Sequence, residues 1–494
     1  MRGLDTFTGM NNPFNQLIIG SGFAGLCAAI KLKEQGENNF VILERNDRLG
    51  GTWYDNHYPG AACDVESHLY SYSFEPNANW SRQFGPQQEI LQYMEHCADK
   101  YDVKKHIEFG APVVSAVFDE AGCIWTVETA PGKKYEARVV ISCSGGLSQP
   151  SLPDIKGIDD FTGKKFHSAQ WDNHYDLKGK TVAVIGTGAS AIQIVPAIAP
   201  WVKQLNLYQR TAPWILPKPD KEISALRRWM YNYVPFAQAL HRTRLYWTHE
   251  LMAFAFVKSP GLLKLFSRLA LRYINKTVKS EALRKKLTPN YVMGCKRVLL
   301  SNEYYQALQL PNVDVITDSI QQITETGVIT TDGKLRAVDA IVLATGFQAA
   351  EEINRFTVRG KNGMDLNECW RNGAEAYLGT FVSGFPNMFL VVGPNTGLGH
   401  SSMILMIEAQ VKLIMETLAA MKKKNARMVD VKKTTQTEFN EDIQTKLAKT
   451  VWQKGGCHSW YQTQSGKNVT LWPGFTFTFM KRTEKFEAEK FDLV

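Results

Sequence analysis

Two short glycine-rich segments have the composition and spacing of nucleotide-binding turns. The first, GSGFAG, places Gly20, Gly22 and Gly25 in the pattern GxGxxG. In such a turn the first glycine permits a tight bend, the second lets the backbone approach a pyrophosphate, and the third lets the next helix pack on the strand. Glu44 ends the following apolar segment, where a carboxylate can accept hydrogen bonds from both ribose hydroxyls of an adenosine. We therefore predict a dinucleotide site at this turn.

The second segment, GTGASA, differs from the first in two informative positions. It contains Gly186 and Gly188, but Ala191 takes the third glycine position. Arg210, in YQRT, stands where the first unit has Glu44. A guanidinium there can pair with a 2′-phosphate, whereas a carboxylate would repel it. This site is predicted to prefer NADPH over NADH; the alternative is a surface arginine beside a structural turn.

The segments around both turns indicate the elements that must position them. QLIIG, FAGLCAAIKLKEQG and NFVILER read as strand, helix and strand around the first turn, and KTVAVIGTG, ASAIQIVPAIA and QLNLYQR repeat that order around the second. The fold class is therefore predicted as α/β, with two dinucleotide-binding Rossmann-like domains and a mostly helical insertion. One site would hold FAD, whose ring does redox chemistry, and the other NADPH, which supplies the hydride.

The predicted domains follow from where these patterns begin and end. An FAD-binding domain is assigned to 13–147 and 348–494, and an NADP-binding domain to 151–220 and 288–347. Residues 221–287 form the predicted helical insertion.

Composition limits the class of protein. Of 494 residues, 44% are hydrophobic and 21% charged, as in ordinary globular chains. No apolar region follows Met1, and the longest apolar run is far shorter than the ~20 residues that span a bilayer. The eight cysteines are scattered without a CxxC pair, which gives no support to a disulfide framework, a zinc site or a dithiol centre. We expect a cytoplasmic protein with reduced thiols.

The predicted insertion accounts for the chain's net excess of positive charge. Residues 221 to 286 contain 14 Lys or Arg and three Glu, whereas the whole chain carries a net charge of only +9. The favoured interpretation is a helical subdomain that packs its aromatic side on the NADP-binding domain and leaves a solvated basic exterior. The alternative is peripheral contact with an anionic membrane. No motif supports nucleic-acid binding. One helix, GLLKLFSRLALRYI, is expected to align apolar side chains on one face, namely Leu262, Leu265, Phe266, Leu269 and Ile274.

Two longer motifs carry a family resemblance. The pattern FxGxxxHxxxW followed by Pro or Asp is filled by Phe161, Gly163, His167, Trp171 and Asp172. The pattern GGxWxxxx(F/Y)PGxxxD is filled by Gly50, Gly51, Trp53, Tyr58, Pro59, Gly60 and Asp64. With GCKR, ATGF and the late SWY, these motifs make the chain resemble the flavin-dependent monooxygenases, and most closely the type I Baeyer–Villiger monooxygenases.

The resemblance implies roles for particular residues. Arg297 matches the active-site arginine, Asp64 would hold its guanidinium in place, and Lys296 would contact the NADP 2′-phosphate. Trp460 matches a tryptophan near the nicotinamide ribose, and His167 would order the linker between domains. The other expected cofactor contacts are Thr52, Trp53, Tyr70, Ser190 and Thr211.

The implied reaction uses FAD, NADPH and O2. Through a C4a-peroxyflavin it inserts one oxygen atom next to a ketone carbonyl, which gives an ester or a lactone. The alternative is an N- or S-oxidising flavin monooxygenase acting on substrates such as sulfides, but those relatives usually carry Phe or Tyr in place of Trp171. A flavin disulfide reductase and a catalytically silent flavoprotein are weaker alternatives. Ala62 and Gln348 depart from the common family pattern, so the resemblance does not determine the shape of the substrate pocket. The sequence also does not determine the natural substrate or the oligomeric state.

Overall fold

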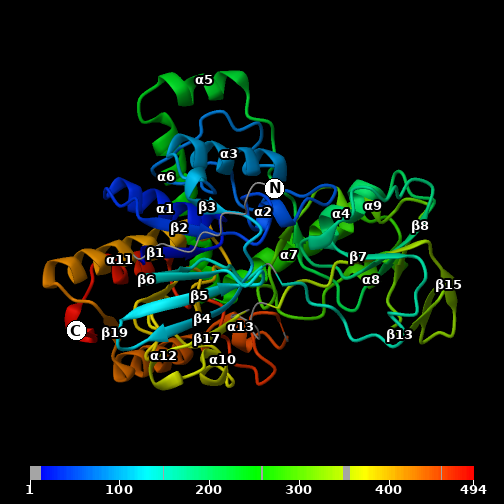
Figure 1. The fold of residues 1–494 in the computed structure, drawn as a ribbon. Coiled ribbons are helices and arrows are strands. Elements are labelled where there is room, and N and C mark those ends of the chain that lie inside the picture. The colour runs from blue at the N-terminus through cyan, green and yellow to red at the C-terminus, as the bar shows by residue number, and fades with distance from the viewer. Residues whose placement is uncertain (1–12, 148, 258–259, 349–355, 458) are drawn as a thin grey trace, which may run out of the picture.

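The computed structural model describes residues 13–147, 149–257, 260–348, 356–457 and 459–494. Two units, each built on a sheet that contains parallel strands, lie side by side, one at the left and one at the right of Figure 1, and the C-terminus lies on the left-hand unit. The predicted fold class, two Rossmann-like units with a mostly helical insertion, is confirmed. Residues 349–355, at the start of the second predicted FAD-binding segment, and 258–259, inside the predicted insertion, lie outside the described residues.

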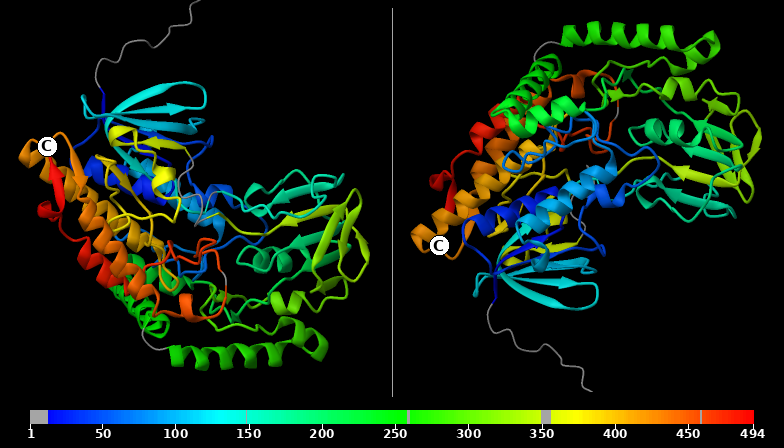
Figure 2. Two further views of the ribbon diagram at one scale, coloured as in Figure 1. Left: turned by 90° about the horizontal axis from the view of Figure 1, so that it is seen from below. Right: turned by 90° about the horizontal axis from the view of Figure 1, so that it is seen from above.

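The left-hand unit is built on an eight-stranded sheet in the order β17-β4-β5-β6-β1-β2-β3, with β18 beside β6. Strand β1 pairs in parallel with both β2 and β6, and its last four residues are buried, as expected for a central parallel strand. Helices α1 (Phe23–Glu34) and α11 (Met403–Lys424) pack together on this sheet (Figure 2). The strands are β1 (Phe14–Ile19), β2 (Phe40–Leu43), β3 (Ile107–Glu108), β4 (Val113–Asp119), β5 (Ile124–Thr129), β6 (Lys134–Ser142), β17 (Thr357–Arg359) and β18 (Met388–Leu390).

The right-hand unit has a five-stranded sheet that is parallel throughout, in the order β12-β9-β8-β16-β7. Helix α4 (Ala191–Ile198) follows β8 and packs on the short helix α9 (Tyr304–Ala307). A small antiparallel sheet is attached through β13 (Ile320–Thr324), β14 (Gly327–Thr330) and β15 (Leu335–Ala337). The five parallel strands are β7 (Lys164–His167), β8 (Thr181–Ile185), β9 (Gln204–Tyr208), β12 (Val313–Ile316) and β16 (Ala340–Leu343).

The insertion consists of four helices, but it packs differently from the favoured expectation. Contacts with the right-hand unit come from α7, which touches β10 (Ile215–Leu216) and α9, and from α8, where Lys286 donates to the carbonyl oxygen of Val315 at 2.7 Å. Helix α6 packs on α13 of the left-hand unit, and Arg242 donates to the carbonyl oxygen of His68 at 2.6 Å. Many aromatic and leucine side chains of the insertion are exposed rather than packed on the right-hand unit. The helices are α5 (Ala225–Tyr233), α6 (Ala237–Val257), α7 (Pro260–Thr277) and α8 (Glu281–Leu287).

The single apolar face expected for α7 is also divided in the structure. Leu262, Leu265 and Leu269 are exposed, whereas Ile274 is buried and Phe266 is half-buried. The exposed leucines are spaced by three and four residues, so they form a stripe of their own on the outer side of the helix.

Shorter elements complete the fold and connect the two units. Among the described residues, no helix is both long enough and apolar enough to cross a bilayer. The remaining helices are α2 (Thr52–Asp55), α3 (Gln87–Lys100), α10 (Leu366–Cys369), α12 (Lys433–Leu447), α13 (Val451–Lys454) and α14 (Thr476–Arg482). The remaining strands are β10 (Ile215–Leu216), β11 (Leu299–Leu300), β19 (Val429–Val431) and β20 (Phe491–Leu493).

Candidate active site

A cavity of about 1100 Å³ lies where the two units meet. Its lining includes the residues that follow β6, β8, β16 and β18, so it sits outside the carboxyl ends of parallel strands from both sheets. Ligands of doubly wound α/β folds bind at such edges. The predicted site residues that line it are Thr52, Trp53, Asp64, Tyr70, Gly186, Gly188, Ser190, Arg210, Thr211, Lys296, Arg297 and Trp460.

The first glycine turn lies beside this cavity and does not line it. Gly20 has φ +97°, and a Cβ there would lie 2.8 Å from the carbonyl oxygen of Cys143. A Cβ on Gly25 would collide with the carbonyl oxygen of Gly20, so the third glycine is required for helix and strand to touch. Gly22 faces Gly51, the residue immediately before Thr52 and Trp53 in the cavity wall. The turn therefore has the close packing that a dinucleotide-binding glycine turn requires.

Glu44 is held against that turn. Its Oε2 accepts hydrogen bonds from the Ser21 backbone N–H at 2.8 Å and from the Ser21 hydroxyl at 2.7 Å, and its side chain is buried. The structure thus brings the acid at the end of β2 next to the glycine turn, as the spacing predicts. Its carboxylate is already ordered by the protein.

The second turn is open on its ligand side. Gly186 has φ +115°, and a Cβ there would collide with the carbonyl oxygen of Ala344, whereas nothing lies within 4 Å of a Cβ on Gly188. Ala191, at the third glycine position, is fully buried at the start of α4. Thr187 donates to the carbonyl oxygen of Thr211 at 2.9 Å and so joins the turn to the end of β9. Ser190 precedes α4 and lines the cavity.

Arg210 and Lys296 form a cationic pair in the wall of the cavity. The pKa of Lys296 is lowered, first by burial and then by the positive charge of Arg210. The two side chains come from different segments, the loop after β9 and the loop before β11, and only the tertiary fold brings them together. Mutual repulsion of this kind is relieved by a bound anion, and a phosphate accepts from both donors.

Arg297 and Asp64 make a bidentate ion pair in the same cavity. The Nε and Nη2 atoms of Arg297 donate to Oδ2 and Oδ1 of Asp64 at 2.7 and 2.8 Å. Burial raises the pKa of Asp64, but the charge and hydrogen bonds of Arg297 outweigh it, and the pKa lies below its usual range. Asp64 in turn raises the pKa of Arg297. The pair is therefore charged, and the guanidinium is fixed with its Nη1 group outside the pair.

Two aromatic side chains from the first unit extend the cavity wall. Trp53 donates from Nε1 to the hydroxyl of Tyr70 at 3.1 Å, and their rings meet edge to face at 5.7 Å. Burial raises the pKa of Tyr70, so this phenol stays protonated. Thr52 begins the helix that carries Trp53.

His167 is placed at the connection between the units. It ends β7, opposite Leu343 of β16, and its ring packs edge to face on Phe347 at 5.6 Å. Its Nδ1 accepts from the Ala169 N–H at 3.1 Å, and burial lowers its pKa. This position fits a role in ordering the 344–347 connection. Trp171 is buried against Phe166.

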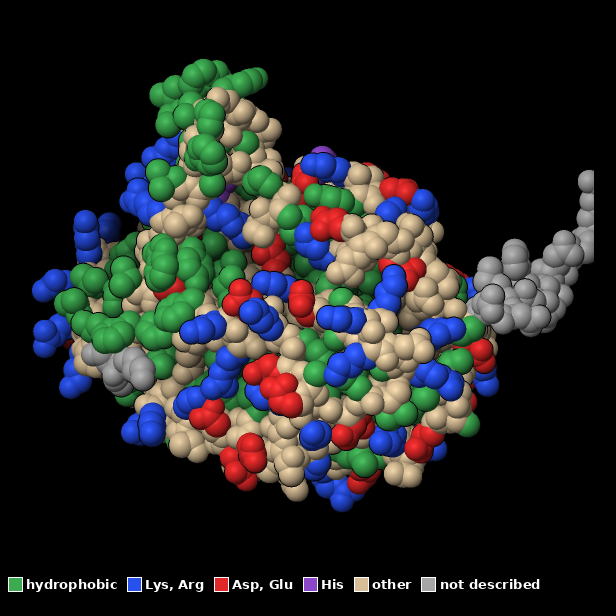
Figure 3. All heavy atoms as spheres, turned by 90° about the vertical axis from the view of Figure 1, so that its left-hand side faces the viewer, with side chains coloured by type: hydrophobic (Ala, Val, Ile, Leu, Met, Phe, Trp, Pro, Cys, Tyr) green, Lys and Arg blue, Asp and Glu red, His purple; other side chains and the backbone are tan. Residues whose placement is uncertain are grey.

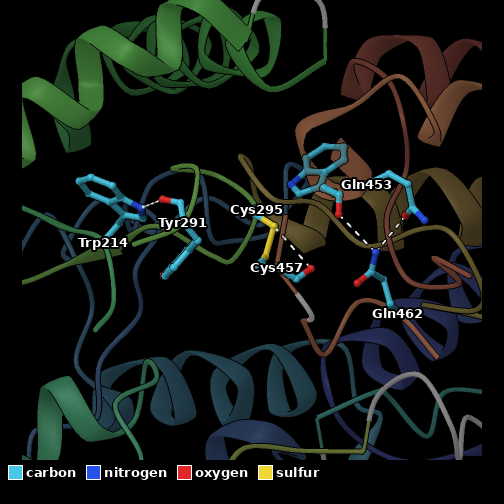
Figure 4. The surroundings of a disulfide bond; sticks show 7 residues. Trp214, Tyr291, Cys295, Gln453, Cys457 and Gln462 are labelled. Atoms are coloured by element: carbon cyan, nitrogen blue, oxygen red, sulfur yellow. Dashed lines mark hydrogen bonds between the residues drawn. A yellow bond between two sulfur atoms is a disulfide. The ribbon is translucent and has the colours of Figure 1, made fainter. Parts of the chain in front are cut away.

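A disulfide joins Cys295 to Cys457, so the expectation that all the thiols are reduced is wrong for these two residues. The sequence gives no sign of it because 162 positions separate the partners. Cys295 precedes Lys296 and Arg297, and Cys457 lies three positions before Trp460. Figure 4 shows the bridge between a Trp214–Tyr291 hydrogen bond on one side and a Gln453–Gln462 hydrogen bond on the other.

The structure adds contacts that the sequence reasoning did not predict. Tyr461, within the SWY motif, is buried beside Arg297; burial raises the pKa of Tyr461 to about 12 although the charge of Arg297 opposes the shift. Tyr58 donates to Gln193 at 2.9 Å, and Gln193 donates to the carbonyl oxygen of Ala62 at 2.9 Å. His57 bridges the carbonyl oxygens of Tyr54 and Trp171, each at 3.0 Å. The GGxW motif therefore also fastens the two units together.

Known proteins are similar to this chain in both sequence and fold. The family model described as flavin-binding monooxygenase-like matches residues 15–353. A Baeyer–Villiger monooxygenase of Pseudomonas aeruginosa is 48% identical over 96% of this chain and 90% of its own length. One of Streptomyces coelicolor is 44% identical over 97% of this chain and 92% of its own length. A closed crystal structure of cyclohexanone monooxygenase superposes with a TM-score of 0.88 at 26% identity, covering 98% of this chain and 100% of that one.

A structure of OTEMO in complex with FAD and NADP gives the same TM-score of 0.88, at 27% identity over 97% of this chain and 99% of that one. The chain therefore belongs to the flavin-binding monooxygenase-like family. The predicted resemblance to the Baeyer–Villiger monooxygenases is confirmed, and so is the enzyme class, a flavin-dependent monooxygenase of that type.

Proposed function

We propose that this enzyme uses FAD and NADPH to insert one oxygen atom of O2 next to the carbonyl carbon of a ketone, giving an ester or a lactone. The observation that carries the proposal is the Arg297–Asp64 ion pair in a cavity shared by both Rossmann-like units. A permanently charged, fixed guanidinium is suited to stabilising negative charge on a reacting oxygen.

The residues of both turns fit the two nucleotides. Gly20, Gly22 and Gly25 would hold the FAD diphosphate at the start of α1, and Glu44 would meet the adenosine ribose. Gly186 and Gly188, with the open space above the latter, would hold the NADP diphosphate. When bound, FAD accepts the hydride of NADPH and activates O2 for transfer to the substrate.

The cationic pair supports NADPH as the reductant. Arg210 and Lys296 line the same cavity and would together bind a phosphate there, and the 2′-phosphate is the group that distinguishes NADPH from NADH. Ser190, Thr211 and Trp460 line the same cavity and would contact the rest of that nucleotide. Thr52, Trp53 and Tyr70 would stand on the flavin side.

Arg297 acts on the reacting atoms, and Asp64 positions it. Asp64 accepts from the Nε and Nη2 donors and so orients the guanidinium, whose Nη1 group would donate toward the substrate oxygen. Its raised pKa means that it stabilises developing charge without giving up a proton. His167 would keep the connection between the units ordered while the nicotinamide site moves.

A ketone is proposed as the substrate class, with sulfides as secondary substrates. A cytoplasmic location is proposed because NADPH is consumed there, and six described cysteines remain free thiols.

The test is aerobic NADPH oxidation by the FAD-loaded enzyme with a panel of ketones and matched thioethers, with every product identified. Ester or lactone from ketones supports the proposal. Sulfoxide alone, or hydrogen peroxide alone with every carbonyl compound, contradicts it.

A further inference from the structure

The helical insertion exposes large apolar side chains on three successive helices. On α5, Leu226, Trp229 and Tyr233 are 68%, 54% and 71% exposed and follow one another at helical spacing. On α6, Leu240, Trp247 and Leu251 are 72%, 53% and 75% exposed and also lie on one face. We call the exposed side of α5, α6 and α7 the insert surface. Unburied side chains of this size would normally be placed in a core or an interface.

The insert surface is carried by helices that contact one another in sequence order. Helix α5 contacts α6, and α6 contacts α7, whose outer leucines include Leu262 and Leu265. Phe477 of α14 approaches Trp247, with ring centroids 6.4 Å apart, and extends the surface beyond the insertion. Figure 3 shows hydrophobic side chains gathered on the projecting part at the top and down the adjoining face, with Lys and Arg along the margin.

Charge on this surface has one sign. Between Ile223 and Ser280 the sequence contains ten Lys or Arg and one acidic residue, Glu250. Glu250 is buried and accepts a hydrogen bond from the Thr476 N–H at 3.0 Å, so it does not offset the exposed cations. The exposed cations here include Arg227, Arg244, Lys264 and Arg268.

The combination of apolar and cationic groups on the insert surface favours one kind of partner over another. A second copy of the chain would bring two positively charged surfaces together, which opposes association. An anionic bilayer accepts both components, because leucine and aromatic side chains enter the headgroup region while Lys and Arg pair with lipid phosphates. Tryptophan and tyrosine are favoured at this depth of a membrane.

We propose that the insert surface docks the enzyme peripherally on anionic lipid bilayers. The insertion reaches the active site through α6, where Phe256 stacks on Trp452 at 6.1 Å and packs against Gly294, two residues before Lys296. Docking therefore takes place on an element that supports the catalytic loop, yet it uses none of the residues proposed to bind cofactors. Membrane docking is a property beyond the proposed oxidation, and it can be tested independently of that reaction.

The test is flotation of the FAD-loaded enzyme with vesicles of phosphatidylcholine alone or mixed with phosphatidylglycerol. Binding is expected only to the mixed vesicles and should fall as ionic strength rises above about 0.1 M, where the screening length is about 10 Å. Replacing Trp229, Trp247 and Leu251 together by Ser should lower partitioning at least about tenfold, and so should Arg227→Gln with Arg244→Gln. The matched control is Trp201→Ser with Lys203→Gln, an exposed aromatic and cation on the other unit, which should bind as the unaltered enzyme does.

Retained NADPH oxidation would show that the variants are folded. The proposal is overturned if the enzyme does not bind anionic vesicles at low salt, or if the same fraction of the serine variant and of the control variant floats with the vesicles. It is also overturned if light scattering shows a dimer that the same serine substitutions convert to monomer, since a second copy would then cover the surface.

Discussion

Arg297 and Asp64 are 233 positions apart in the sequence, yet Nε and Nη2 of the arginine reach both carboxylate oxygens at 2.7 and 2.8 Å. Asp64 follows the GGxW motif of the first unit, and Arg297 precedes β11 in the second. The pair therefore joins the two units at the point where both predicted nucleotides would meet.

Arg297→Ala should retain FAD but lose ester formation. The substitution removes the positive charge proposed to stabilise the reacting oxygen, and loss of one such donor lowers kcat by about 10²–10³-fold. The measurements are flavin absorbance, anaerobic bleaching by NADPH, and ester yield. Bleaching should persist. An unchanged ester yield would refute the assignment of Arg297.

Asp64→Asn should lower the yield of ester while the enzyme still binds its cofactors. The amide keeps the size of the carboxylate but removes the charge that fixes Arg297 and raises its pKa. We expect the ester yield per NADPH to fall and the release of hydrogen peroxide to rise. The ratio of ester to hydrogen peroxide should fall by about tenfold, because a charge-assisted pair contributes roughly 1.5–3 kcal/mol. A variant that couples NADPH to product as well as the unaltered enzyme would show that Asp64 does not position Arg297.

Lys296→Met and Arg210→Gln should each raise the KM for NADPH and leave that for NADH unchanged. Each substitution removes one of the two cations proposed to bind the 2′-phosphate, which corresponds to about tenfold or more in affinity. The measurement is steady-state flavin reduction with both nucleotides. Lys264→Met removes an exposed cation outside the cavity and serves as control. Equal losses with NADPH and NADH would contradict a 2′-phosphate site.

Cys457→Ser should loosen the segment that carries Trp460. The disulfide ties this segment to the loop of Lys296 and Arg297, so its removal enlarges the set of conformations available to both. We expect more hydrogen peroxide per NADPH consumed, and a reductant such as dithiothreitol should have the same effect on the unaltered enzyme. Cys369→Ser, which alters an exposed free thiol, is the control. Identical peroxide release from all forms would mean that the bridge has no part in coupling.

His249→Gln should lower thermal stability most near pH 6. Burial lowers the pKa of His249, but the hydrogen bond and charge of Glu66, 2.7 Å away, outweigh it and raise the pKa; Glu66 has a lowered pKa in return. A raised histidine pKa contributes stability that is complete below the unfolded value of about 6.5 and is lost as pH rises through the folded value. A lowered glutamate pKa contributes stability above about pH 4.3 and loses it in acid.

The pair should therefore stabilise most between about pH 4.5 and 6.5. The Tm of the variant is expected to fall by about 2–4 °C at pH 6 and by less at pH 8.5. His96→Gln is the control, because His96 is 60% exposed beside Glu75. A Tm difference that does not change with pH would show that His249 acts by packing alone.

Local pattern was enough to predict the two Rossmann-like units and the family. Glycine spacing, alternating strand and helix segments and the spaced motifs all depend on neighbours in the chain, and the resulting prediction of a flavin-dependent Baeyer–Villiger monooxygenase is confirmed. The Arg297–Asp64 contact was suggested by resemblance, and the structure brings the two side chains together.

Contacts between distant segments followed from the three-dimensional packing. The Cys295–Cys457 bridge, the closeness of Arg210 to Lys296 and the link from Tyr58 through Gln193 each join residues whose separation in the chain carries no local signal. The same holds for the insertion. Its apolar spacing was visible in the sequence, but which apolar stripe turns inward depends on the surfaces that α6 and α7 meet, and those surfaces exist only once both units have folded.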